Sequence, residues 1–106
     1  MTRRATKLRQ VLDEATLNRV AHTLKAVAHP LRLRIVEVLA DREMCVSDLI
    51  EALGTKPACT SQQLGLMRDR GVLSCRREGS RVYYRVSSPS VVNVIACIRR
   101  HCDQVR

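Results

Sequence analysis

The sequence predicts a mainly α-helical fold that carries one β-hairpin, with about five helices and two strands. Apolar residues recur every three to four positions through most of the chain, which is typical of amphipathic helices. Between residues 72 and 86 the period changes to two around a glycine, which indicates a hairpin. The 106 residues are 45% hydrophobic, enough to bury the core of one stable domain that spans 1–106.

The first clear helix is expected from Thr16 to Ala28, with Thr16 as its N-cap. Its apolar residues recur at helical spacing, at Leu17, Val20, Ala21, Leu24, Val27 and Ala28. Residues 1–15 are basic and have a weaker apolar pattern. They form either an N-terminal arm or a short helix, and the sequence leaves both open.

A second helix is expected to begin at Pro30 and to run to about Ala40. His29 ends the preceding helix because the residue before a proline avoids helical geometry, whereas proline fits the first position of a helix. The apolar stripe of this second helix comprises Leu31, Ile35, Val38 and Leu39.

Residues 47–70 have the layout of a helix-turn-helix. Ser47 is the expected N-cap of a short helix, and Gly54 is the residue that ends it. A second helix follows over 57–70, with inward side chains expected at Thr60, Leu64 and Met67. A short helix, a turn containing glycine and a second helix together make this motif.

The hairpin at 72–86 has Gly79 in its predicted tip, and a last helix follows at 88–103. Residues 91–98 of that helix are apolar nearly all round. One domain face needs fewer apolar residues than this, so we expect a second subunit to cover the rest.

The charge of the chain points to nucleic acid. The net charge is +9, and sixteen of the 19 cationic residues are arginine, which makes bidentate contacts to phosphate and guanine. Six arginines and two acidic residues lie between Arg68 and Arg85, a net charge of +4 centred on the hairpin. A charge run is often only a solvated surface, but its position directly after a helix-turn-helix favours binding.

Several classes of protein are disfavoured by what the sequence lacks. It has four glycines and no phosphate loop, G-x-S-x-G elbow or H-E-x-x-H motif, so we expect no enzyme. No stretch approaches the roughly 20 apolar residues of a membrane span, and no signal-peptide pattern is present, so we expect a cytoplasmic protein with no membrane partner. The five cysteines are odd in number and form no C-x-x-C pair, which indicates reduced thiols.

A helix-turn-helix followed by a hairpin is the winged helix-turn-helix arrangement. Its second helix enters the major groove of double-stranded DNA, and the hairpin, or wing, lies along the backbone. We expect Gln62 to read adenine, and Ser61 to donate to a base edge or a phosphate. The wing is expected to contact phosphates or the minor groove in a salt-sensitive manner. The full set of expected DNA contacts is Lys56, Ala58, Ser61, Gln62, Arg68, Arg76, Arg77, Ser80 and Arg81.

Four stretches resemble the ArsR/SmtB family of metal- and redox-responsive repressors. They are L-K-A-V-A-H-P-L-R-L-R-I-V-E-V-L (24–39), E-M-C-V-S-D-L (43–49), T-S-Q-Q-L-G-L-M-R-D-R-G-V-L (60–73) and R-R-E-G-S-R-V-Y-Y-R-V (76–86). The resemblance implies a homodimer, paired mainly through its first and last helices, that releases a palindromic operator when an inducer binds. It places Ser61 and Gln62 on the family's base-contacting positions, and Arg77, Ser80 and Arg81 on its wing.

This chain departs from the family at the sensing sites. The family's zinc sensors place ligands at the two ends of the last helix, and here those positions are Ser88, Ser90, His101 and Gln104. Only His101 is a metal ligand among them. The thiophilic sensors use a Cys-x-Cys pair, of which Cys45 remains while Ser47 replaces the second cysteine. Both types of site are therefore incomplete.

The cysteines of the last helix offer another sensing site. Cys97 and His101 are four residues apart, so they share a face that can chelate a soft ion, with Cys102 adjacent. Arsenite or another thiophilic ion would use three thiolates drawn from this helix, its dimer mate or Cys45, and a disulfide across the dimer is the redox alternative. The sequence thus favours a repressor released by a thiophilic metal, a metalloid, or a redox or sulfide signal. The alternative is a regulator without sensing, whose cysteines only fill the core.

Two further classes rank lower. One is an interaction protein that keeps the winged-helix fold but binds RNA or a protein. RNA readers commonly stack bases on aromatic side chains, and only Tyr83 and Tyr84 are aromatic here. A thiol enzyme would need a cysteine of low pKa, which the arginines near Cys75 make conceivable. For Cys45, Cys75 and Cys59 the expectation is a role as apolar filler.

Overall fold

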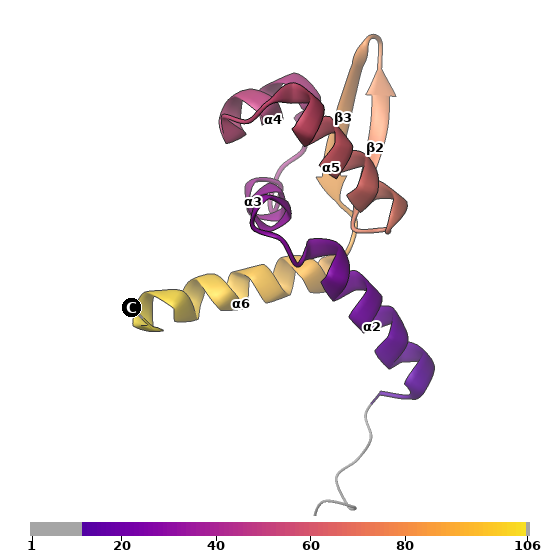
Figure 1. Ribbon diagram of the computed structural model, residues 1–106, viewed down its shortest axis with the longest axis vertical. Coiled ribbons are helices and arrows are strands. Elements are labelled where there is room, and N and C mark those ends of the chain that lie inside the picture. Colours follow the sequence, from indigo (N-terminus) through magenta and orange to yellow (C-terminus); the bar gives the residue numbers. More distant parts are fainter. Residues whose placement is uncertain (1–11, 106) are drawn as a thin grey trace, which may run out of the picture.

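The computed structural model describes residues 12–105, and Figure 1 shows how its elements are arranged. In this part of the chain, helix α3 lies at the centre, α4 and α5 lie beside the β2–β3 hairpin, and α2 and α6 lie at the end away from the hairpin tip. The elements in chain order are α2 (Glu14–Val27), α3 (Pro30–Val38), β1 (Met44–Cys45), α4 (Val46–Leu53), α5 (Pro57–Asp69), β2 (Leu73–Glu78), β3 (Arg81–Val86) and α6 (Pro89–Val105). The predicted fold class, mainly α with a β-hairpin wing, is confirmed.

Helix α2 begins two residues earlier than expected. Asp13 is its N-cap, and the Asp13 carboxylate accepts a hydrogen bond from the backbone N–H of Thr16 at 2.8 Å. The prediction of Thr16 as the cap is wrong, because an acceptor three residues before it already satisfies that N–H. Of the predicted N-terminal arm or short helix, residues 1–11 lie outside the described residues.

The cap of helix α3 is His29, whose Nδ1 accepts a hydrogen bond from the N–H of Leu31 at 3.1 Å. Pro30 stands in the first turn, as predicted. Helix α4 begins one residue before Ser47, with Cys45 in the cap position and no side-chain cap bond, so Ser47 as the N-cap is wrong. Gly54 ends α4 with a φ of +65°, a conformation that costs glycine little.

The sheet has three antiparallel strands in the order β1-β3-β2, where the sequence predicted two. Met44 pairs with Tyr84 and Cys45 with Tyr83, so the short extended piece before α4 joins the edge of the hairpin. The hairpin register runs from Leu73 opposite Val86 to Glu78 opposite Arg81, which leaves a two-residue tip at 79–80. A strand of two residues carries too little alternation to be recognised in a sequence.

The core lies where the central helix meets the helix-turn-helix and the base of the sheet. Val36, which the predicted stripe of α3 omitted, is fully buried, whereas Leu31 and Val38 are only partly buried. The buried apolar residues are Ala26, Val27, Ile35, Val36, Leu39, Cys45, Leu49, Leu64, Met67, Val72, Leu73, Tyr84, Val91 and Ile95. No helix in the described part of the chain is long and apolar enough to cross a membrane.

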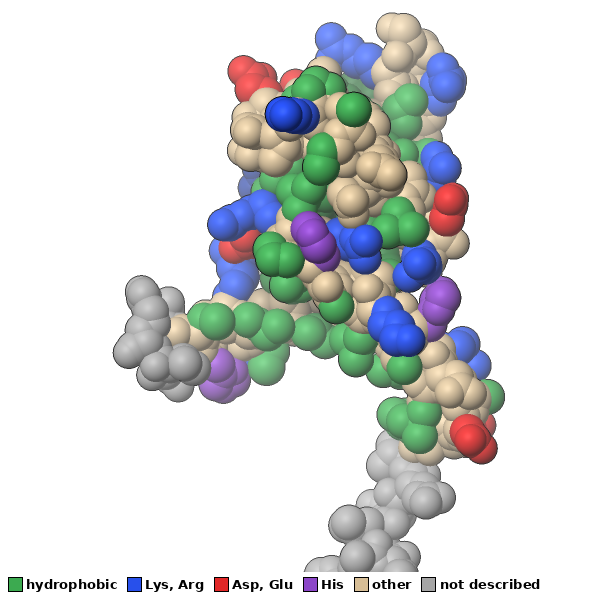
Figure 2. All heavy atoms as spheres, viewed as in Figure 1, with side chains coloured by type: hydrophobic (Ala, Val, Ile, Leu, Met, Phe, Trp, Pro, Cys, Tyr) green, Lys and Arg blue, Asp and Glu red, His purple; other side chains and the backbone are tan. Residues whose placement is uncertain are grey.

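An apolar surface remains uncovered on α2, α3 and α6. Figure 2 shows green side chains gathered along the edge of the molecule where α6 and α2 lie. On α6, Val91 and Ile95 face the core, whereas 43% of Val94 and 45% of Ile98 is exposed. The exposed large apolar residues of this face are Leu17, Val20, Leu24, Leu33, Val94 and Ile98, and we call them the α2–α6 face.

Candidate nucleic-acid interface and thiol sites

The packing of α5 determines which of its side chains face solvent. Thr60, Leu64 and Met67 are fully buried, as predicted, and they anchor one side of the helix. The side chains on the other side are therefore free to contact a partner. The exposed residues that the sequence predicted here are Lys56, Ala58, Ser61, Gln62 and Arg68.

A contact between helices that the sequence did not predict holds α5 in place. The Nε of Arg32 on α3 donates a hydrogen bond of 2.7 Å to the Oε1 of Gln63, next to Gln62. The same guanidinium lies 3.5 Å from the carbonyl oxygen of Lys25 in the last turn of α2. Residues 31 positions apart meet here, so local sequence patterns give no signal for the contact.

The register of the hairpin places its arginines on two faces. Residues directly opposite each other in an antiparallel pair share a face, and neighbours along a strand alternate. Arg77 and Cys75 thus share the face of the buried Tyr84, while Arg76 lies on the other face with Tyr83. Arg77, Ser80 and Arg81 are all exposed at or near the hairpin tip.

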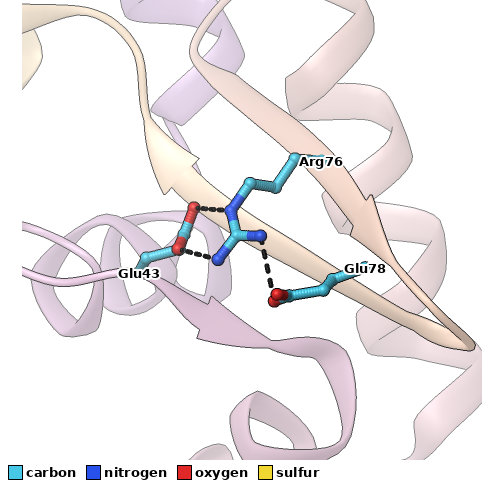
Figure 3. Close-up of polar contacts among 3 residues, drawn as sticks. All are labelled: Glu43, Arg76 and Glu78. Carbon is cyan, nitrogen blue, oxygen red and sulfur yellow. Dashed lines mark hydrogen bonds and ion pairs between the residues drawn. The ribbon is translucent and has the colours of Figure 1, made fainter.

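The Arg76 guanidinium is held between two carboxylates, as Figure 3 shows. Its Nε and Nη2 donate to the two oxygens of Glu43 at 2.9 and 2.8 Å, and its Nη1 donates to Glu78 at 3.1 Å. The guanidinium carbon also lies 4.6 Å from the centre of the Tyr83 ring. The hydrogen bonds from Arg76 lower the pKa of Glu43, so Glu43 is ionised at neutral pH.

Two further arginines of the candidate interface, Arg68 and Arg81, keep their charge. The neighbouring Cys75 and Tyr84 side chains raise the pKa of Arg68, and Tyr83 raises the pKa of Arg81. Both groups therefore stay protonated at any physiological pH. Arg68 also lies 3.3 Å from the carboxylate of Asp69, an exposed ion pair that screening keeps weak.

The thiols are distributed over both ends of the molecule. Cys45 is buried at 2% exposure, with its Sγ 3.3 Å from the Ser47 hydroxyl. The other four cysteines are exposed, which contradicts the expected filler role of Cys59 and Cys75. Cys59 lies on the recognition helix α5 and Cys75 on strand β2 of the wing, whereas Cys97 and Cys102 lie on α6.

The structure brings Cys97 and His101 together on α6, with Cys97 Sγ 3.7 Å from His101 Nδ1. His101 Nδ1 also lies 2.9 Å from the carbonyl oxygen of Cys97, and because a carbonyl oxygen only accepts, Nδ1 is the donor of this hydrogen bond. Cys102 lies in a groove between α3 and α6. In the described residues no three histidine, cysteine or acidic side chains gather in a way that holds a metal ion.

The helix-turn-helix, the wing and the exposed arginines define a winged-helix transcriptional regulator that binds DNA. The family model of bacterial regulatory proteins of the arsR family matches residues 29–74. An HTH-type transcriptional regulator of Mycobacterium tuberculosis is 36% identical over 76% of this chain and 71% of its own length. This chain belongs to the ArsR family, and it is a regulator and not an enzyme.

Two solved structures are similar to the whole described fold. The AntR antimony-specific transcriptional repressor has a TM-score of 0.79 and 31% identity, and 94% of each chain is covered. A homodimeric winged helix-turn-helix DNA-binding domain from Mycobacterium bovis has a TM-score of 0.75 and 30% identity, covering 91% of this chain and 92% of its own.

Proposed function

We propose that this protein is a homodimeric transcriptional repressor that binds an inverted-repeat operator and releases it in response to a thiol-directed signal. The observation that carries the DNA-binding part is the exposed face of α5, flanked by a wing whose arginines are also exposed. As a DNA-binding regulator it acts in the cytoplasm, where bacterial DNA lies.

The proposed DNA contacts fall into two groups, those that read bases and those that bind phosphate. Gln62 has the amide that forms a bidentate contact with adenine, and Ser61 can donate to a base edge or a phosphate. Contacts to phosphate position the protein without reading sequence. The contacts from α5 are Lys56, Ala58, Ser61, Gln62 and Arg68, and those from the wing are Arg77, Ser80 and Arg81.

A homodimer is supported by the α2–α6 face. Several large apolar side chains of this face are 40% to 51% exposed, and they form one band along α2 and α6. A contiguous apolar patch of this kind marks an interaction surface. Two copies of one recognition helix, related by a two-fold axis, would read an inverted repeat.

The DNA-binding proposal is tested by retardation of a duplex that carries an inverted repeat, measured at rising salt. Gln62→Ala is expected to relax base discrimination, at a cost of about 1 to 3 kcal/mol, and Arg81→Ala to reduce the salt slope by about 1. Arg100→Ala is the matched control, because Arg100 is an exposed arginine on α6, at the end away from the wing. Normal binding by both test variants would show that this docking is wrong.

The sensing site that we propose comprises Cys97, Cys102 and His101, with Cys45 as a further thiol. Cys97 and Cys102 are exposed and accessible to a metal or an oxidant, and His101 stands within 3.7 Å of Cys97. A soft ion such as arsenite binds thiolates, and AntR is a repressor specific for antimony. One α6 supplies too few ligands, so the metal site would draw on the second subunit, whereas Cys45 is a separate thiol buried on β1.

The sensing proposal is tested by release of the operator on addition of arsenite, cadmium, zinc, polysulfide or peroxide. Cys97→Ser and Cys102→Ser are each expected to abolish the response to the true inducer while leaving DNA binding intact. Cys75→Ser is the control for an exposed thiol on the wing. If no compound releases the operator, the chain is a regulator without thiol sensing.

A further inference from the structure

The Glu43–Arg76–Glu78 cluster spans the whole sheet. Arg76 lies on β2, Glu43 directly precedes β1, and β3 lies between these two strands. The Arg76 side chain crosses the ring of Tyr83 on β3, 4.6 Å from its centre, and forms both hydrogen bonds with Glu43 on the far side. The two outer strands are thus connected across the middle one (Figure 3).

The wing needs such a connection because little else supports its outer half. Strand β1 has two residues, and it pairs with β3 only at Tyr83 and Tyr84. Beyond these pairs, the last residues of both hairpin strands have only each other as strand partners. A two-stranded ribbon twists easily, so its direction depends on contacts at its base.

We propose that Arg76 is a positioning residue, and that its pairing with Glu43 sets the direction of the wing relative to the recognition helix α5. Three hydrogen bonds to two carboxylates occupy its guanidinium, whereas Arg77 has no carboxylate within ion-pair distance in the described residues. Arg77 and not Arg76 is then the phosphate ligand of strand β2. This inference rests on the proposed DNA binding.

A positioning role and a purely electrostatic role predict opposite effects of Glu43→Ala on the affinity for DNA. Glu43→Ala removes a negative charge near the wing and frees the cation of Arg76, so a purely electrostatic role predicts tighter DNA binding. A positioning role predicts weaker binding by about three- to tenfold, because the wing phosphate contacts lose their geometry. The thermal unfolding midpoint is expected to change little, because isolated exposed ion pairs contribute little to stability.

The experiment is a double-mutant cycle of Glu43→Ala and Arg76→Ala, read by affinity for the inverted-repeat duplex as a function of salt. We expect each single variant to weaken binding. The double variant should bind no worse than either single variant, because both substitutions break the same contact. Arg77→Ala should instead lower the salt slope by about 1. Glu51→Ala, which removes an exposed carboxylate on α4, is the control for charge alone.

The outcomes separate this inference from the proposed function. If Gln62→Ala and Arg77→Ala weaken binding as expected but Glu43→Ala binds as tightly as the parent or tighter, only the positioning role is overturned. An additive cycle, or a salt slope that Arg76→Ala reduces as much as Arg77→Ala does, would also overturn it. If the parent protein does not bind the duplex at all, the DNA-binding function itself fails.

Discussion

At the scale of single residues, neighbours of one type have different roles because of the face on which they lie. Arg76 and Arg77 are adjacent on β2, yet the alternation of the strand puts only Arg76 within reach of Glu43. Gly65 is another residue whose expected role depends on the face on which it lies. It lies in the middle of α5, and a Cβ there would meet nothing closer than an Arg68 nitrogen at 4.0 Å.

Gly65→Ala is expected to stabilise the free protein by about 0.5 to 1 kcal/mol, because glycine inside a helix costs backbone entropy. Gly65 shares the helix face of Ser61 and Gln62, where the DNA backbone would approach most closely. We therefore expect the same substitution to weaken DNA binding. Urea unfolding and duplex retardation measure the two effects, and a variant that binds as tightly as the parent would show that α5 does not approach DNA at this position.

The wing contact should also depend on pH. Hydrogen bonding to Arg76 lowers the pKa of Glu43 below its ordinary value of 4.5. The contribution of this contact to stability is therefore fully present when the pH is above that ordinary value. Its contribution is lost as the pH falls through the lowered pKa of the folded state. Backbone amide NMR of residues 76–83 in acid should report this loss, and Glu43→Ala should remove the transition.

At the scale of elements, the ends of helices are determined by contacts within a few residues. The N–H of Gly54 donates to the carbonyl of Ile50 at 3.0 Å, and its positive φ turns the chain towards α5. Proline at the first position of α3 and α5 was readable in the sequence, and both starts are confirmed. The cap of α2 was mispredicted because Asp13 offers an acceptor three residues before Thr16, and the cap of α4 because that helix begins at Val46 without a side-chain cap.

Gly54→Ala is expected to destabilise the domain by about 1 to 2 kcal/mol. A Cβ at this glycine would meet no atom within 4 Å, so the cost comes only from the left-handed backbone. Urea unfolding measures the change. Ala52→Gly, at an exposed position inside α4, is the comparison for a change in backbone entropy, with an expected cost of about 0.5 to 1 kcal/mol.

At the scale of the whole molecule, the wing and the α2–α6 face lie at opposite ends (Figure 1 and Figure 2). The wing and its arginines extend from one end, and the α2–α6 face lies at the other (Figure 2). One end can then pair with a second copy while the other stays free for DNA. The last helix has apolar residues on two sides, as its sequence predicted. Val91 and Ile95 face the core, whereas Val94 and Ile98 face outward.

Ile98→Glu is expected to dissociate the proposed dimer, because it puts a charge into an apolar contact. The monomer should keep its helical circular dichroism, since Ile98 lies outside the core, and should bind a half-site more weakly than the dimer binds the full repeat. Analytical ultracentrifugation measures the oligomeric state. Asn93→Glu, at an exposed polar position on the same helix, is the control, and an unchanged dimer in the Ile98 variant would place the interface elsewhere.

The sequence by itself determined the helices, the hairpin, their order and the family, because periodicity, proline, glycine and charge act over short distances. It also determined which residues of α5 face outward, since the buried Thr60, Leu64 and Met67 recur at helical spacing. Only the tertiary structure decided the third strand, the Arg32–Gln63 contact and the pairing of Arg76 with Glu43. These join residues some 30 or more positions apart, and a side chain's partner across such a distance depends on how the elements pack.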